Sequence, residues 1–151
     1  MEIKIRNADN TDLSAMVELL RELFAIETDF TFDQKKQHKG LSLMLDGCGK
    51  HRCIKVAEGE QGVVGMVTAQ VLISTAQGSP VALVEDMVVE AKHRQQGIGR
   101  QLLLAMESWA RERGVTRMQL LAERTNFQAL DFYDKIGWMP TRLICLRKKW
   151  T

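Results

Sequence analysis

The feature that most constrains this chain is a nearly continuous apolar stretch that runs into a glycine loop and then into an amphipathic pattern. Residues 81–89 predict a strand, residues 94–99 spell Arg-Gln-Gln-Gly-Ile-Gly, and apolar residues then recur at helical spacing. Placing Gly97 and Gly99 at a helix start lets the backbone come close to a ligand. The first N–H groups of that helix have no partner within it, so they predict a site for a phosphate or a related anion.

The other periodic segments predict a mixed sheet of the α/β or α+β class in a single domain, residues 1–151. The helix after residue 98 should join two parallel strands by a right-handed crossover. Asn10 and Thr11 predict the cap of the first helix, and Gly65 predicts a bulge in its strand. We expect strands over residues 3–6, 53–58, 63–74, 81–89, 116–122 and 143–148, and helices over residues 12–24, 33–45 and 126–136 and from residue 98 up to Gly114.

The composition is ordinary for a soluble globular protein, with 45% hydrophobic and 26% charged residues. No apolar run approaches the roughly 20 residues of a membrane span, and the N-terminal residues lack the apolar core of a signal peptide. Three cysteines, Cys48, Cys53 and Cys145, form an odd and sparse set. That set favours a reducing compartment, so we expect a cytoplasmic protein that does not bind membranes.

Charge is divided unevenly along the chain. Residues 1–90 carry 9 Lys or Arg and 14 Asp or Glu, a net charge of −5, whereas residues 91–151 carry 12 and 5, a net charge of +7. A basic second half suits a polyanionic cofactor, and an acidic first half suits a cationic acceptor. The basic residues are not interleaved with aromatic ones, which argues against nucleic acid as a partner.

The segment containing Cys48, His51 and Cys53 offers three metal-ligand side chains within six residues. No second cluster accompanies it, and the spacing falls short of tetrahedral zinc sites. We expect turn residues that enter a strand here, and no bound metal.

Two motifs resemble those of one enzyme family. Residues 94–99 resemble the Arg/Gln-x-x-Gly-x-Gly/Ala loop of the GNAT superfamily of N-acetyltransferases. Residues 126–138 are similar to the family's Asn-x-x-Ala-x-x-Phe-Tyr-x-x-x-Gly-Phe segment, with Trp138 in place of the usual Phe. Two motifs at the proper separation are more specific than either alone. The resemblance extends to the order of elements, and it implies the GNAT fold: a twisted, mostly antiparallel sheet with one splayed parallel strand pair and about four helices.

The resemblance implies that acetyl-CoA is the cosubstrate. In the family, the glycine loop holds the pyrophosphate, the strand before it pairs its backbone with the pantetheine arm, and one N–H there polarises the thioester carbonyl. The Asn of the second motif contacts the pantetheine or orders its helix. By this resemblance we expect the cofactor to contact Met87, Val88, Val89, Arg94, Gln95, Gln96, Gly97, Ile98, Gly99, Arg100, Asn126 and Tyr133.

Two side chains are candidates for proton transfer. The resemblance places the hydroxyl of Tyr133 near the CoA sulfur, where it would act as general acid, although it could equally be a packing aromatic. Glu85 stands in an apolar strand, where burial would raise its pKa toward that of a useful base. Strand alternation should send Asp86 to the opposite face, so we favour Glu85 as the base. Asp86, a water molecule, or a salt bridge from Glu85 to an arginine remain alternatives.

The acceptor site is expected between the first two helices, because that segment shapes it in the family. Glu27 and Asp29 would attract a small cationic amine, and Phe30 would cover its methylenes, with Glu85 also facing the substrate. A solvated loop pinned by phenylalanines is the alternative. No Ser or Cys stands in a nucleophile-elbow motif, so direct attack in a ternary complex is expected rather than an acetyl-enzyme.

The sequence thus predicts a cytoplasmic N-acetyltransferase that acts on a primary amine, as a homodimer through the sheet edge or the residues 143–148. Three rivals remain: a non-catalytic acetyl-CoA sensor, a protein acetyltransferase that modifies lysine or N-terminal amines, and a Rossmann dinucleotide protein. The last would require Gly-x-Gly-x-x-Gly after the first strand, whereas this loop comes late and has two glycines.

Overall fold

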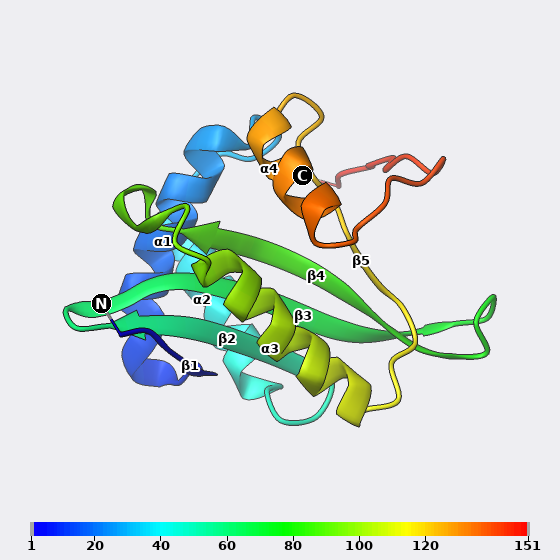
Figure 1. Cartoon of the computed structure of the whole chain (residues 1–151), viewed down its shortest axis with the longest axis horizontal. Helices are drawn as coiled ribbons and strands as arrows, with labels where there is room; N and C mark the ends of the chain where they lie inside the picture. The colour runs from blue at the N-terminus through cyan, green and yellow to red at the C-terminus, as the bar shows by residue number, and fades with distance from the viewer. Residues whose placement is uncertain (1, 151) are drawn as a thin grey trace. The chain divides into compact units, whose positions relative to one another are not determined.

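The computed structural model describes residues 2–150, and the chain divides after Leu120 into two compact units, which are described separately. The first unit contains one five-stranded sheet in the order β1-β2-β3-β4-β5, in which only β4 and β5 are parallel (Figure 1). Its strands are β1 (Lys4–Asn7), β2 (Arg52–Gly59), β3 (Gly62–Ser74), β4 (Ser79–Val89) and β5 (Met118–Leu120), and its helices are α1 (Leu13–Ile26), α2 (Gln34–Asp46) and α3 (Ile98–Glu112). The expected mixed sheet is confirmed.

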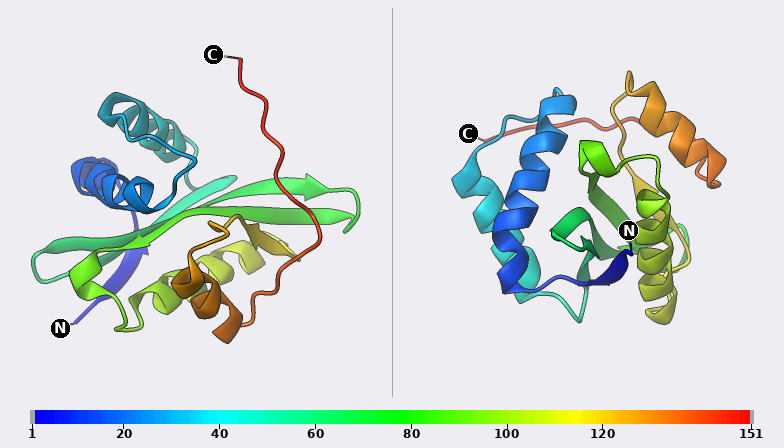
Figure 2. Two further views of the ribbon diagram at one scale, coloured as in Figure 1. Left: turned by 90° about the horizontal axis from the view of Figure 1, so that it is seen from above. Right: turned by 60° about the vertical axis from the view of Figure 1, so that its left-hand side comes forward.

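Helices cover both faces of this sheet. Figure 2 shows α1 and α2 on one face and α3 on the other. On the first face the expected stripe of α1 packs, with Met16, Val17 and Leu20 buried against Met66 and Val88 of the sheet. On the second face the predicted stripe of α3 is buried along its whole length, from Ile98 to Ala110. Since β3 lies between the two helical layers, its residues 64–69 are all buried, as expected for a central strand.

The helix ends follow local chemistry, with one correction. A short 3-10 turn, η1 (Asn10–Asp12), precedes α1, and its cap is Asp9, not Asn10 or Thr11: the Asp9 carboxylate accepts the N–H of Thr11. The N-cap of α1 itself is Asp12, which makes no side-chain capping bond. An aspartate accepts the exposed donors better than the neutral side chains that follow it. Asp33 caps α2 by accepting the N–H groups of Lys35 and Lys36, and Gly114 follows α3 with a φ of +76°.

The β2–β3 hairpin contains the expected irregularity, displaced by one residue. Ala57 pairs with Gly65 and Glu58 pairs with Val63, so Val64 is the extra residue of a bulge. Gly65 itself allows close packing, because a Cβ there would lie 3.2 Å from Cδ1 of Leu102 in α3. The hairpin and α3 are thereby held together beside the end of β4.

The β4–β5 pair is much shorter than the sequence predicts. Parallel pairing runs only from Ala82↔Met118 to Val84↔Leu120, whereas a strand over residues 116–122 was expected. Beyond Val84, β4 continues to Val89 while β5 has ended, so the two strands splay. A left-handed residue in β4, Asp86 with a φ of +53°, bends the strand at the point where they part.

The second unit contains α4 (Phe127–Lys135), within the predicted range. Asn126 caps it by accepting the N–H of Ala129 at 3.1 Å, and Gly137 ends it with a φ of +96°. The strand predicted over residues 143–148 is wrong, because the described chain has no strand there. Leu143, Ile144 and Leu146 are 71–87% exposed, and a strand forms only where a neighbour completes its hydrogen bonds.

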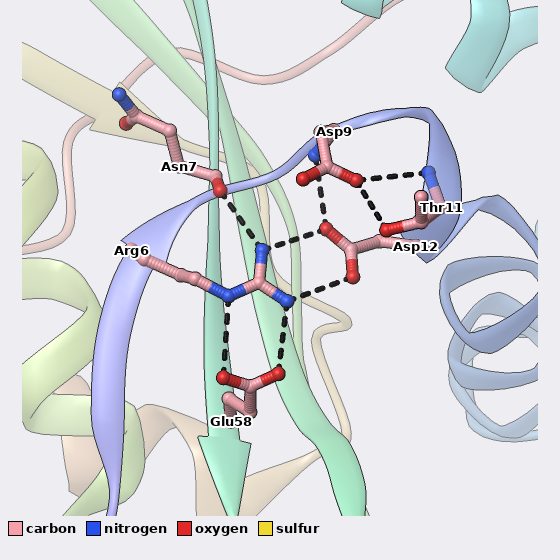
Figure 3. Close-up of polar contacts among 6 residues, drawn as sticks. All are labelled: Arg6, Asn7, Asp9, Thr11, Asp12 and Glu58. Carbon is pink, nitrogen blue, oxygen red and sulfur yellow. Dashed lines mark hydrogen bonds and ion pairs between the residues drawn. The ribbon is translucent and has the colours of Figure 1, made fainter.

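A charged cluster ties the start of the first unit to its sheet (Figure 3). The guanidinium of Arg6 in β1 donates to both carboxylate oxygens of Asp12, at 2.8 and 2.9 Å, and to Glu58 of β2 at 3.2 Å. Asp12 also accepts the N–H of Asp9. The Asp12 side chain is only 6% exposed, and the hydrogen bonds from Arg6 lower the pKa of its carboxyl.

Replacing Arg6 with Met should lower the free energy of unfolding by about 2–3 kcal/mol at pH 7, because Asp12 would be left buried without its cation. Since the pKa of Asp12 is lowered in the folded chain, the loss should be complete above the ordinary carboxyl pKa of about 4. It should shrink as the pH falls through the lowered folded value. Urea unfolding at pH 7 and at about pH 3 measures both quantities.

The matched control is Arg111→Met, which removes an exposed i,i+4 pair with Glu107 on α3. It should change the unfolding free energy by less than about 0.5 kcal/mol. Equal losses in the two variants would contradict a special role for the Arg6 cluster.

Candidate functional site

The glycine loop begins where β4 ends and closes where α3 begins. A short 3-10 turn, η2 (Ala91–His93), leads into it, and Gln95 and Gly97 have left-handed φ values of +62° and +80°. Such alternation of backbone conformations turns successive N–H groups toward one side and makes a concavity suited to anions. Gly97 is the N-cap of α3 and has no side chain to cap it.

Space beside Gly97 is open. The residue is exposed, and a Cβ built on it would meet no heavy atom of the described chain within 4 Å. Side chains cap α2 and α4, through Asp33 and Asn126, and Asp9 caps the short turn η1 before α1, whereas α1 and α3 have no side-chain cap of their own. The first N–H groups of α3 therefore face an unobstructed region with the positive end of the helix dipole behind them.

The cations flanking the loop differ in how they are held. Nε of Arg94 donates to the carbonyl oxygen of Val89 at 2.9 Å, and its Nη2 lies 3.7 Å from Oε1 of Glu22 in α1. Arg100 is exposed in the first turn of α3. Ile98 is only 2% exposed, so its side chain belongs to the core and its backbone alone can face a ligand.

The second half of β4 offers a free backbone edge. Pairing with β5 stops at Val84, so residues 85–89 have no strand partner on that side among the described residues. On the other side, Val88 and Val89 pair with Met66 and Gly65 of β3, and their side chains are buried. Met87 falls in the irregular part of this ladder. Val88 and Val89 can therefore offer only backbone groups to a ligand on the open edge.

The two acidic residues of β4 reverse our expectation. Glu85, expected to be buried, is exposed, whereas Asp86 is half-buried. Strict alternation fails here because Asp86 adopts a left-handed conformation within the bulge. Its Oδ2 lies 3.3 Å from the hydroxyl of Thr68, a buried polar side chain of β3 that also lies 3.1 Å from the carbonyl oxygen of Glu85.

Burial gives Asp86 an unusual titration. Loss of solvent, with a smaller contribution from the neighbouring charge of Glu85, raises the pKa of Asp86 to about 6. The hydrogen bond from Thr68 opposes the rise. The physical reason for choosing Glu85 as the base, burial in an apolar strand, thus applies to Asp86.

The segment between α1 and α2 combines carboxylates with packed rings. Asp29 and Phe30 are exposed and Glu27 is half-buried at the end of α1. The ring of Phe30 lies 5.2 Å from that of Phe24, and the guanidinium of Arg21 lies 4.2 Å from the Phe32 ring centre. Phe30 and Phe32 therefore pack this segment against side chains of α1, and the segment carries the carboxylates of Glu27 and Asp29.

The residues of the second motif lie in the second unit. Asn126 orders α4 as its cap, one of its two expected roles. Tyr133 packs against Phe132 and Trp138, with ring centres 5.2 and 5.9 Å away. Tyr133 therefore packs its ring between two aromatic neighbours, one of them in an edge-to-face arrangement.

A polar pocket of about 610 Å³ lies beside the loop, between the β2–β3 turn and the end of β4. Among its lining residues are Glu60, Glu90, Lys92, His93 and Gln96. Nδ1 of His93 is 3.2 Å from Oε2 of Glu90, at an angle that makes no hydrogen bond. Of the predicted cofactor residues only Gln96 lines this pocket.

Sequence reasoning missed the contact made by Glu22. Besides facing Arg94, its Oε1 accepts the N–H of Ala91 at 3.1 Å. In the sequence it is one of two carboxylates in α1, with Glu18, and no signal marks it. Within the described residues, no group of three or more potential ligand side chains is arranged to hold a metal ion, and no helix is long and apolar enough to cross a bilayer.

Comparisons with known proteins agree with the geometry. A family model described as the acetyltransferase (GNAT) family matches residues 14–138. The chain is 31% identical over 145 residues to the thialysine N-epsilon-acetyltransferase of Bos taurus, covering 89% of this chain and 83% of that protein. It is 36% identical over 55 residues to an uncharacterized N-acetyltransferase of Bacillus subtilis, but this match covers 36% of the chain and only 22% of the relative.

Solved structures show the same fold. The aminoglycoside N-acetyltransferase AAC(6')-Iy, in complex with CoA, superimposes with a TM-score of 0.84 at 19% sequence identity. The match covers 99% of this chain and 96% of that one. At this level of identity the likeness concerns the fold alone.

Replacing Asp86 with Asn should stabilise the protein at pH 7 by about 1 kcal/mol, because the variant avoids burying a charge and Asn tolerates a left-handed φ. A raised folded pKa means that wild-type stability falls as the pH rises from about 4 to about 6. The gain should therefore vanish below about pH 4. Urea unfolding at pH 4 and pH 7 tests this, and a loss of stability at pH 7 would contradict it.

Proposed function

This chain belongs to the acetyltransferase (GNAT) family of acetyl-CoA-dependent acyltransferases, and we propose that it transfers the acetyl group of acetyl-CoA to a primary amine of a small molecule. The observation that carries the proposal is the open N-terminus of α3 at Gly97, which adjoins the free backbone edge of β4. A non-catalytic acetyl-CoA sensor is the alternative from another class.

The residues of the first unit fit the cofactor. The N–H groups at Gly97, Gly99 and Arg100 would receive the diphosphate, with Arg94 and Arg100 supplying positive charge. Gln95 and Gln96 would line the approach to the loop. The splayed edge of Met87, Val88 and Val89 would pair with the amides of the pantetheine arm, and one of its N–H groups would polarise the thioester carbonyl. Bound acetyl-CoA supplies the activated acetyl group.

The two carboxylates of β4 divide the work on the amine. Glu85, exposed at the bulge, would attract the protonated amine. Asp86, with a pKa raised to about 6, would accept the proton that the amine must lose before it attacks. The proposed base is therefore Asp86 rather than Glu85, because burial raises the pKa of Asp86.

Acceptor binding is proposed at the segment after α1. Glu27 and Asp29 display negative charge there, and Phe30, which is 43% exposed, offers a flat apolar surface for methylene groups. The relative from Bos taurus carries a name that specifies thialysine, a basic amino acid with a side-chain amine, as its substrate. Together these features support a small cationic amine rather than a neutral or anionic acceptor.

The second unit is proposed to complete the same N-acetyltransferase domain. Asn126 orders α4, and the hydroxyl of Tyr133 would return a proton to the departing thiolate of CoA. We also propose a cytoplasmic homodimer. The exposed side chains of Leu143, Ile144 and Leu146 support an interface, because a contiguous apolar run on a monomer favours association. Light scattering across a dilution series tests the oligomeric state.

Replacing Gly97 with Ala should weaken acetyl-CoA binding by about tenfold or more, because the new Cβ would enter the space proposed for the diphosphate and the left-handed φ would be strained. The cost in folding stability should be about 1 kcal/mol, since no atom of the described chain lies within 4 Å of that Cβ. Titration calorimetry with acetyl-CoA measures the binding.

The matched control is Gly114→Ala, which has a similar φ of +76° and open surroundings at the other end of α3. It should show the same loss of stability and unchanged binding. Equal effects on binding in both variants would contradict a diphosphate site at Gly97.

Replacing Asp86 with Asn should lower the turnover of a primary amine by about 100-fold or more and abolish the fall in rate below about pH 6.

Two other variants separate the remaining roles. Glu85→Gln should raise the KM for the amine. Tyr133→Phe should lower turnover while the affinity for acetyl-CoA is preserved. The measurement is CoA release over a panel of amines as a function of pH. An Asp86→Asn enzyme with the wild-type pH profile would return the base role to Glu85 or to water.

A further inference from the structure

Glu22 reaches from α1 to the glycine loop and contacts both ends of the short segment 91–94. Its Oε1 accepts the N–H of Ala91 at 3.1 Å and lies 3.7 Å from Nη2 of Arg94. We propose that Glu22 is a positioning residue for acetyl-CoA: it holds the entry of the loop and the guanidinium of Arg94 in the orientation that receives the diphosphate. This inference rests on the proposed function.

The loop needs such an anchor because the sheet stops holding it at Glu90. The N–H of Glu90 donates to the carbonyl oxygen of Val64 at 2.8 Å, and the N–H groups of His93 and Arg94 then close only local turns. Ala91 stands between these two sets of bonds and is exposed. The carboxylate of Glu22 is therefore the contact that ties the start of η2 to a rigid helix.

Arg94 is held from two directions at once. Its Nε donates to the carbonyl oxygen of Val89 at the end of β4, while its Nη2 faces Glu22. A guanidinium has five N–H donors in a rigid plane, so fixing it at these two points directs the remaining donors. An arginine oriented in advance loses less conformational entropy when a phosphate binds.

The charge of Glu22 matters less than its position. The Glu22 and Arg94 side chains are 37% and 35% exposed, so solvent screens their attraction and the pair adds little to folding stability. The directional bond to Ala91 is retained by any side chain that places an oxygen at the same point. Glutamine does so, because its amide oxygen replaces Oε1 without the charge.

Glu22 also connects the two proposed binding regions. It lies five residues before Glu27, on the helix that leads directly into the segment proposed for the amine. The same rigid element thus carries the anchor of the cofactor loop and the start of the acceptor segment. A change at Glu22 should be felt first in the affinity for acetyl-CoA.

Calorimetric titration with acetyl-CoA tests the inference in the full chain. Glu22→Ala should raise the Kd about fivefold, the effect expected from losing one positioning hydrogen bond, whereas Glu22→Gln should stay within about twofold of the wild type. Amide hydrogen exchange should show faster exchange at Ala91 in Glu22→Ala and not in Glu22→Gln. Should the alanine variant fail to fold, Glu22→Asp replaces it. Aspartate is shorter by one methylene and withdraws the carboxylate from Ala91, so the same rise in Kd is expected.

The matched control is Glu18→Ala, one turn earlier on α1, whose carboxylate pairs with Arg21 of the same helix and not with the loop. Its Kd should stay within about twofold of the wild type. Equal Kd values for wild type and Glu22→Ala, or a glutamine variant as weak as the alanine one, would overturn the positioning role. Failure of the wild type itself to bind acetyl-CoA would instead overturn the proposed function on which it rests.

Discussion

Backbone that has no neighbouring strand and no side-chain cap within the described fold is the feature on which the rest of this structure depends. It occurs at the start of α3, where the N-cap is a glycine, and along the second half of β4, where β5 has ended. An unpaired polar backbone group is costly unless water or a ligand satisfies it. Both regions lie on one continuous stretch of chain, residues 85–100, so a single extended ligand with amide and phosphate groups suits them together.

Asp86 shows how the fold creates this edge. A non-glycine residue with a φ of +53° in the middle of a strand is unfavourable, and so is a carboxylate withdrawn from water. Asp86 combines both unfavourable features, and it lies just beyond the last β4 residue that pairs with β5. The surrounding sheet supplies the stability that maintains them, and the hydroxyl of buried Thr68 contacts both the Glu85 carbonyl oxygen and the Asp86 carboxylate. Stability is exchanged there for a carboxylate whose raised pKa suits proton transfer near neutral pH.

The sequence predicted the parts of the fold that local chemistry determines. The stripes of α1 and α3 and the helix ends at Gly114 and Gly137 were all found where periodicity and turn chemistry placed them. The strand at residues 143–148 was not found, because apolar composition does not show whether a neighbouring strand exists. The exposure of Glu85 was missed because strict alternation assumes a regular strand, and nothing in the sequence marks Asp86 as left-handed. Glu22 was missed because its partner is a backbone N–H 69 residues away.

The central claim is that the N–H groups at the start of α3 and along the free edge of β4 bind one acyl-CoA molecule. Amide chemical shifts in ¹⁵N-labelled protein, followed while CoA is added, test this claim most directly. The account predicts the largest shifts at Gly97, Gly99 and Arg100 and at residues 86–89, saturating together at a single Kd. Shifts confined to other parts of the chain, or no shifts at millimolar CoA, would contradict it.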